Sequence, residues 1–313
     1  MIKKKRNYFL ELVVYLCYPI ILVLAFIPFK LLYALSDFIT FILFNFISYR
    51  KRTILKNLSI VFPEYTERKK LKIGKESIRN FVDSILELIK SSTMSDARLL
   101  KHITATNLEI LHEIKSSNQP ALFLSAHFGN FDLSLKAASL HSGIKTVGVY
   151  KPFKNLAVER LLKYLRKGNK AELVAMRKVG WYVVESLKDK NPYILGMVVD
   201  QSPKLPTSHY FTTFFDEPTS VFNGYESLAR RLDLSVYFIH THKIKRGYYK
   251  STIVPITSNA RKTKRWDIVD TYYELLEKQI KAQPQYYLWT HKRWKVTLEN
   301  TSSIISKSPK LAN

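Results

Sequence analysis

Short apolar runs separated by segments of helical length constrain the fold of this chain more than any other feature. Ala121–Ala126, Lys145–Tyr150 and Tyr193–Val199 have the length and composition of buried strands. Two further strands are predicted over Ser235–His242 and Tyr249–Val254. The predicted helices are Arg52–Ser92, Asn107–Ser116, Phe131–Leu140, Leu156–Lys167, Gly180–Lys188, Ser220–Leu232 and Asp267–Ala282. Strands separated by such helices indicate the α/β class, with a mostly parallel central sheet flanked by helices.

The amino-terminal region is apolar enough to enter a membrane. Leu12–Phe29 carries no charge over about 18 residues, the lower end of what spans a bilayer. Pro19 and Pro28 would kink or stop a helix there. A second apolar stretch, Leu31–Ile47, contains one acid, Asp37. We therefore predict a hydrophobic helical membrane module over residues 1–50 and one catalytic domain over residues 51–313.

Several arrangements of this module are compatible with the sequence. A cleaved signal peptide is disfavoured, because the apolar part is too long and no small-residue cleavage site follows. A buried helical pair is disfavoured because Leu12–Phe29 lacks a polar face. A spanning helix or hairpin and an insertion lying in one leaflet both remain open. Basic residues at Met1–Arg6 and Tyr49–Arg52 predict that the catalytic domain lies on the cytoplasmic side of the inner membrane.

The charge balance indicates a polyanionic partner. The 313 residues include 50 Lys and Arg against 25 Asp and Glu, a formal net charge of +25. Nucleic acid, an anionic membrane and a phosphorylated substrate would all suit this charge. Nucleic acid is disfavoured, because no zinc finger, helix-turn-helix or RNA-binding aromatic motif is present.

The chain offers little for metal or disulfide chemistry. Its one cysteine, Cys17, cannot form an internal disulfide, and no Cys/His cluster has structural-zinc spacing. His240 and His242 would share one face of a strand, but no third ligand is evident. We predict no metal and no cofactor.

A histidine after a predicted strand is the strongest chemical signal. His127 follows Ala121–Ala126, and ligands of α/β folds bind outside the carboxyl ends of the strands. Asp132 could fold back through a turn at Gly129 and orient the imidazole, leaving its other nitrogen as a general base. The alternative is a helix-capping Asp132 beside a structural histidine, because this spacing alone is weak.

The wider pattern resembles a known family. His127–Asp132 is similar to the HX4D/E motif of the glycerophosphate/lysophospholipid acyltransferase superfamily. Nearly the whole chain resembles the bacterial lipid A late acyltransferases (lauroyl/myristoyl acyltransferase family), in Asn57–Glu64, Ser125–Asp132, Tyr150–Asn155, Glu159-Arg160, Arg177, Asp200-Gln201, Phe214-Phe215 and Tyr287–Lys295. Asp216 departs from a glycine common in the family, and Asp132 from a glutamate.

The resemblance implies a glycerol-3-phosphate acyltransferase-like fold and direct acyl transfer from a thioester to a hydroxyl. The implied donor is acyl carrier protein or acyl-CoA, and the implied acceptor is a lipid A precursor in the inner membrane. His127 would be the general base, oriented by Asp132. Cys17 in the membrane segment and Ser125 outside any G-x-S-x-G turn are not plausible nucleophiles.

The predicted substrate-binding residues are Asn130, Arg160, Arg177, Asp200 and Gln201. Either arginine could bind phosphate or an oxyanion, or be a solvated surface cation. Asp200 and Gln201 end a predicted strand on the same sheet edge as His127, although capping is an equal alternative. An apolar groove near the amino-terminal module is expected to hold acyl tails.

Other functions remain open at this point. The acceptor could be a phospholipid, glycolipid or aminolipid. The chain could also be a non-catalytic membrane-binding protein of the same fold, or a hydrolase that releases free fatty acid.

Overall fold

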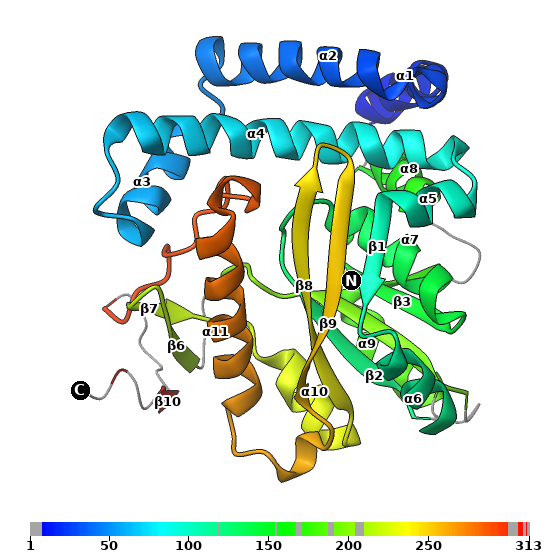
Figure 1. Cartoon of the computed structure of the whole chain (residues 1–313), viewed down its shortest axis with the longest axis vertical. Coiled ribbons are helices and arrows are strands. Elements are labelled where there is room, and N and C mark those ends of the chain that lie inside the picture. The colour runs from blue at the N-terminus through cyan, green and yellow to red at the C-terminus, as the bar shows by residue number, and fades with distance from the viewer. Residues whose placement is uncertain are drawn as a thin grey trace.

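The computed structural model describes residues 8–117, 119–153, 155–166, 171–186, 191–203, 210–299, 306–308 and 311. Within these ranges a seven-stranded sheet forms the centre of the molecule, and a layer of helices from the amino-terminal quarter lies across one end of it (Figure 1).

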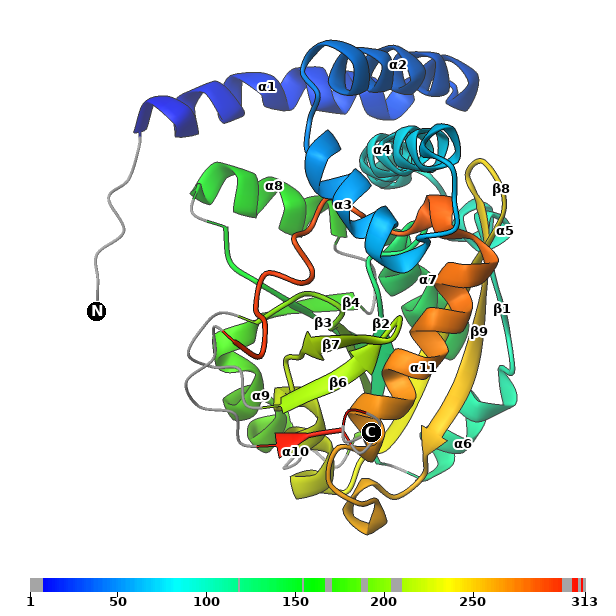
Figure 2. The same ribbon diagram turned by 90° about the vertical axis from the view of Figure 1, so that its left-hand side faces the viewer.

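The helical layer contains α1 (Tyr8–Phe26), α2 (Phe29–Phe41) and α4 (Glu67–Lys90), with α3 (Lys51–Val61) beside them. A π-helical turn, Ile42–Phe46, continues α2. Figures 1 and 2 show α1 and α2 at the top, with α4 beneath them. Phe29–Phe46 is the one segment of the described chain that is both long and apolar enough to cross a membrane.

The central sheet has the strand order β1-β9-β8-β2-β5-β3-β4. All neighbouring strands are parallel except the β8–β9 hairpin, which is antiparallel. The strands are β1 (Ile103–Thr106), β2 (Ala121–Ser125), β3 (Lys145–Tyr150), β4 (Ala171–Ala175), β5 (Tyr193–Val198), β8 (Ser235–Lys245) and β9 (Tyr248–Thr257). The carboxyl ends of β2, β5, β3 and β4 therefore share one edge of the sheet.

Side chains of the central strand β2 alternate between two cores. Leu122 and Leu124 belong to the larger buried cluster, whereas Ala121 and Phe123 belong to a smaller one. Because neighbouring strand residues point to opposite faces, β2 is buried on both sides. The covering helices are α5 (Asp96–His102), α6 (Glu109–Ser117), α7 (Phe131–Ser142), α8 (Leu156–Arg166), α9 (Val179–Ser186), α10 (Gly224–Leu232) and α11 (Asp267–Ala282).

A small second sheet, in the order β10-β6-β7, lies beside α11 (Figure 1). It consists of β6 (Tyr210–Phe214), β7 (Glu217–Ser220) and β10 (Ser306–Lys307). Asp270 of α11 accepts hydrogen bonds from Tyr210 and Thr212 of β6 and from Ser308. These contacts fasten the small sheet to α11.

The predicted fold class, an α/β protein with a mostly parallel central sheet, is confirmed. The helix predicted over Arg52–Ser92 is two helices, because Pro63 follows the end of α3 and cannot continue it. The predicted helix ends Lys167 and Lys188, and Lys154 of the family-like stretch, lie outside the described residues. The domain boundary at residue 50 stays a prediction.

Candidate active site

His127 and Asp200 are brought together by two adjacent parallel strands. The register of β2 and β5 pairs Ser125 with Val198, and each side chain comes two residues beyond its strand. The Val199 backbone N–H donates to the Ser125 carbonyl at 3.2 Å, which continues the ladder past the strand ends. As a result, His127 Nδ1 lies 2.7 Å from Asp200 Oδ1.

The surroundings of the pair favour its charged form. Burial alone lowers the pKa of His127, but the charge of Asp200 and its hydrogen bond outweigh burial, so the pKa is raised. Burial raises the pKa of Asp200, but His127 and a hydrogen bond from Tyr287 outweigh it and hold the pKa below its usual value. Asp200 is therefore a carboxylate at neutral pH, and it fixes the imidazole proton on Nδ1.

The second imidazole nitrogen faces outward. The His127 side chain is 20% exposed, whereas that of Asp200 is 3% exposed. Gln201 Nε2 lies 3.3 Å from His127 Nε2, and the Phe131 ring packs edge-on with ring centroids 4.8 Å apart. With the Nδ1 proton held by Asp200, His127 Nε2 is the acceptor nitrogen: it receives the Gln201 amide hydrogen bond here, and it is the atom at which a general base would take up a proton.

A segment near the carboxyl terminus closes one side of the site. The Leu288 N–H donates to the His127 carbonyl, and the Gly129 N–H donates to the Tyr286 carbonyl, both at 3.0 Å. Beyond this short antiparallel bridge, His291 Nε2 accepts a hydrogen bond from the Ser202 N–H at 3.1 Å. Burial, followed by the nearby charge of Arg293, lowers the pKa of His291 to about 4, so it is neutral near pH 7.

Helix α4 supports the turn that follows His127. Asn80 Nδ2 and Ser84 Oγ donate to the Gly129 carbonyl at 3.0 and 2.9 Å. Gly129 has φ +58°, and an added Cβ would lie 3.2 Å from Cγ2 of Thr241. Both the left-handed backbone and the close packing therefore require glycine at this turn.

The structure corrects the predicted partner of the imidazole. Asp132 lies in the first turn of α7 and forms an ion pair with Arg166 of α8, at 2.7 Å between Oδ1 and Nε. Its charge adds to the raised pKa of His127, but the hydrogen bond predicted for it is made by Asp200. The reason is geometric: adjacent strands place Asp200 opposite the ring, whereas α7 directs Asp132 toward α8.

Asn130 has an internal role that differs from the predicted substrate contact. Its side-chain oxygen caps α7 by accepting from the Leu133 N–H at 3.1 Å. Its side-chain nitrogen donates to Glu87 Oε2 at 2.8 Å, and the residue is only 1% exposed. The substrate-binding role of Asn130 stays a prediction.

The two predicted arginines lie apart from the His127–Asp200 pair. Arg177 is exposed just after β4, which is three strands from β2, or roughly 14 Å across the sheet. Arg160 of α8 donates to the Tyr15 hydroxyl at 2.5 Å and lines a cavity of about 330 Å³ between α1 and α8. That cavity is otherwise mostly apolar; its lining includes Tyr18, Ile21, Leu22, Leu161, Tyr164 and Leu165.

Sequence reasoning missed the parts that Tyr287, His291 and Arg166 play. For Tyr287 and His291, the one signal in the sequence is that the closing Tyr287–Lys295 stretch resembles the family. Asp200 and Gln201 do share the sheet edge of His127, as predicted. Among the described residues, no group of three His, Cys, Asp or Glu side chains could hold a metal ion.

Known proteins similar to this chain are enzymes of lipid A biosynthesis. A lipid A biosynthesis lauroyltransferase of Escherichia coli K12 is 22% identical over 284 residues, covering 88% of this chain and 89% of that protein. A lipid A biosynthesis palmitoleoyltransferase of the same organism is 23% identical, with 83% of each chain covered. A lipid A biosynthesis acyltransferase of Haemophilus influenzae is 23% identical, covering 77% of this chain and 76% of that protein.

The sequence model of one protein family matches residues 2–296, which is most of the chain and includes the whole His127 site. The chain therefore belongs to the bacterial lipid A biosynthesis acyltransferase family.

Proposed function

We propose that this O-acyltransferase moves an acyl chain from the thioester of acyl carrier protein, or of CoA, to a hydroxyl of a lipid A precursor. The observation that carries the mechanism is the His127–Asp200 pair, with one imidazole nitrogen bound and the other facing outward. The family assignment supports lipid A as the acceptor class.

In the proposed reaction, His127 Nε2 takes the proton of the acceptor hydroxyl as the oxygen attacks the thioester carbonyl. Asp200 stabilises the imidazolium that forms, in the manner of the acid in hydrolytic triads. Collapse of the tetrahedral intermediate breaks the C–S bond, and the imidazolium returns its proton to the departing thiolate. The products are the new ester and the free thiol.

In this proposal, Gln201 stabilises the tetrahedral intermediate. Its amide nitrogen lies beside His127 Nε2, where the reacting carbonyl would come to rest. A neutral donor that points at a developing oxyanion lowers the barrier more than it strengthens ground-state binding. Loss of such a donor typically costs about 10²-fold or more in kcat.

The apolar cavity between α1 and α8 is the proposed site of an acyl tail. Its lining, which comes from α1, Ser92 and α8 and is mostly apolar, supports this proposal. Arg160 at this cavity is a proposed partner for a phosphate of the acceptor. Arg177 is a proposed second anion contact farther along the sheet edge.

Asp132 acts, in this proposal, through Arg166 and through its charge near His127. The catalytic domain is proposed to work at the cytoplasmic face of the inner membrane, where acyl carrier protein and CoA thioesters are found. The basic surplus of the chain would attract these acidic donors and the lipid phosphates.

The test is acyl transfer by the purified full chain and by His127→Ala. We expect the variant to lose at least about 10³-fold in kcat, because base and proton shuttle are removed together. Mass spectrometry of lipid A from cells with and without the gene should show one acyl chain fewer in its absence. Unchanged lipid A with altered phospholipids would identify a different acceptor. Release of free fatty acid without any acceptor would identify a hydrolase.

A further inference from the structure

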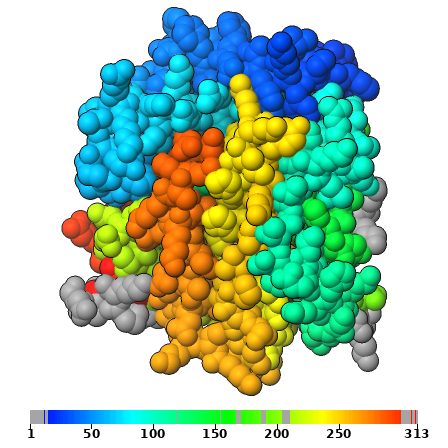
Figure 3. Space-filling model, viewed as in Figure 1, coloured from blue at the N-terminus to red at the C-terminus, as the bar shows by residue number. Residues whose placement is uncertain are grey.

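The outward faces of α1 and α2 are almost entirely apolar. The exposed fractions are 74% for Phe26, 61% for Phe38 and 73% for Phe46. Other exposed large apolar side chains of the same layer are Leu12, Leu16, Ile20, Leu22, Val23, Leu31, Phe41 and Ile47. Figures 1 and 2 show both helices lying across the top of the molecule, and Figure 3 shows them as its upper rim. Soluble surfaces rarely carry so large an apolar patch.

The opposite face of α2 is held to the protein by polar contacts. Ser36 Oγ donates to Asp83 Oδ1 of α4 at 2.6 Å. The Arg246 guanidinium joins Asp37 of α2 to Asp83, at 2.9 and 2.7 Å. A membrane-crossing α2 would break these bonds or carry them into hydrocarbon, which is unfavourable for ionised groups.

A stripe of basic residues on α4 emerges from beneath α2. Arg68, Lys72, Lys75 and Arg79 are all exposed, and their spacing of three or four residues places them on one face of the helix. Asp83, the next residue on this face, is the one that bonds Ser36 of α2. Within the part of the chain that the structure describes, none of the four forms an ion pair with an acid. We call these four residues the α4 basic stripe.

We infer that the protein binds a single anionic leaflet of the membrane. In this arrangement α1 and α2 lie in the membrane plane, and the α4 basic stripe binds lipid headgroups. The apolar face supplies burial among acyl chains, as in interfacial amphipathic helices. The stripe lies one helix layer deeper, about 10 Å from the apolar face, which is the level of the headgroups. Basic side chains at that level attract anionic lipids.

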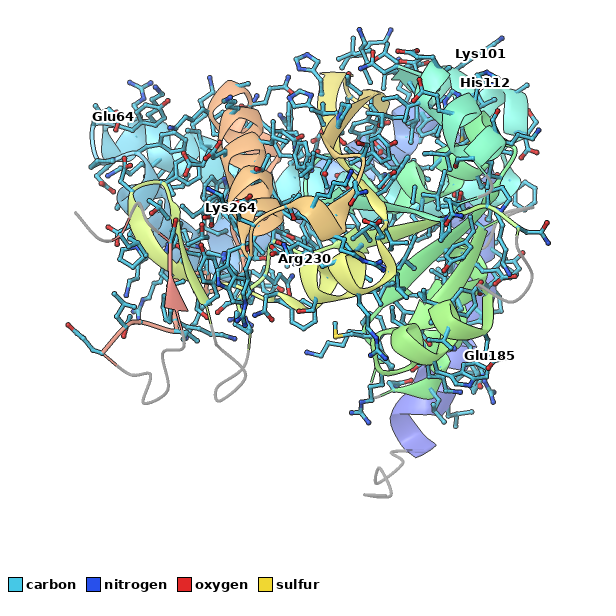
Figure 4. All side chains as sticks on the ribbon, turned by 90° about the horizontal axis from the view of Figure 1, so that it is seen from below. Glu64, Lys101, His112, Glu185, Arg230 and Lys264 are labelled. Carbon is cyan, nitrogen blue, oxygen red and sulfur yellow. The ribbon has the colours of Figure 1, made fainter. Side chains whose placement is uncertain are left out.

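The first test measures flotation of the full chain with vesicles of phosphatidylcholine, with and without added phosphatidylglycerol. We compare a variant with Arg68→Gln, Lys72→Gln, Lys75→Gln and Arg79→Gln. A control with the same charge change carries Arg261→Gln, Lys262→Gln, Lys264→Gln and Arg265→Gln. These residues are exposed, and Figure 4 shows Lys264 on the side of the molecule seen from below, away from α1 and α2.

We expect the stripe variant to bind the anionic vesicles at least about tenfold more weakly, while the control and binding to neutral vesicles change little. Equal losses in both variants would overturn the assignment to lipid headgroups. The assignment would also be overturned if the stripe variant bound vesicles as before but showed a raised KM for an acidic carrier protein. Because flotation needs no turnover, its outcome is independent of the proposed reaction.

The second test distinguishes an in-plane α2 from a spanning one. Lys30 and Arg50 are exposed at opposite ends of the Phe29–Phe46 segment. In a Cys17→Ser background, Lys30→Cys and Arg50→Cys should both react with a membrane-impermeant maleimide from the same side of sealed vesicles. Labelling from opposite sides would refute the in-plane arrangement.

Discussion

At the scale of single residues, the site depends on which carboxylate holds the imidazole. Asp200 is nearly inaccessible and bonds Nδ1 directly, whereas Asp132 is committed to Arg166. A buried carboxylate orients the ring and stabilises its cation. The two acids should therefore respond differently to the same substitution.

We predict that Asp200→Asn lowers kcat by about 10²–10⁴-fold, because the amide no longer fixes the productive tautomer or stabilises the imidazolium. The base must be neutral to act, so activity falls as pH drops through the His127 pKa. Asp200 raises that pKa, so its removal should move the acid limb of the pH–rate profile to lower pH. Asp132→Asn, the control, should shift the limb less in the same direction. A larger loss in Asp132→Asn than in Asp200→Asn would contradict this ranking.

The sequence alone identified His127, Asp200 and Gln201 and placed them on one sheet edge. It paired His127 with Asp132 because only four residues separate them, whereas Asp200 is distant in sequence. Only the register of β2 against β5 shows that His127 and Asp200, each two positions after the end of its strand, face one another. Strand register between distant segments cannot be read from apolar patterns, which specify only the two faces of each strand.

At the scale of elements, α4 connects the amino-terminal helical layer to the candidate active site. One face bears the basic stripe and then Asp83, which bonds α2, and another holds the Gly129 carbonyl through Asn80 and Ser84. Glu87 belongs to this second face and accepts a hydrogen bond from Asn130 at 2.8 Å. A single helix thus sets the position of the turn that carries His127.

We predict that Ser84→Ala lowers kcat severalfold and lowers the free energy of unfolding by about 1 kcal/mol, because one hydrogen bond to the Gly129 carbonyl is lost. Ser116→Ala is a matched control: both serines bond the carbonyl four residues earlier, but only Ser84 also reaches the turn. KM should change little, and Ser84→Thr, which restores a hydroxyl, should recover part of the rate. Equal kinetics for the two alanine variants would show that α4 does not position His127.

Apolar patterns predicted the central strands well, because most residues of β2, β3 and β5 are buried and apolar. They missed β1, β4, β6, β7 and β10, which are short or lie at sheet edges. Edge strands such as Ile103–Thr106 and Ala171–Ala175 mix polar and apolar residues, since one side meets solvent. Tertiary contacts rather than local preference decide such segments.

At the scale of the whole molecule, the amino-terminal helical layer and the α/β domain share a largely apolar cavity. Tyr18 and Ile21 of α1 face Leu161 and Leu165 of α8 across it, and the Tyr18 hydroxyl donates to the Ala157 carbonyl at 2.7 Å. This cavity is the proposed acyl-tail site, so its volume should decide which acyl chains are accepted.

Filling the cavity should change which acyl donors are used. We predict that Leu161→Trp lowers kcat/KM more for donors with longer acyl chains. Each methylene that no longer fits into the apolar cavity costs about 0.8 kcal/mol, roughly fourfold in kcat/KM. Short-chain donors should keep most of their activity, since His127 and Asp200 are untouched. The measurement is kcat/KM across acyl thioesters of increasing length. Val184→Trp is the control, because it adds an indole on α9 outside the cavity, where the Val184 side chain is 51% exposed. A uniform loss at all chain lengths would show that the cavity supports α8 instead of binding the acyl tail.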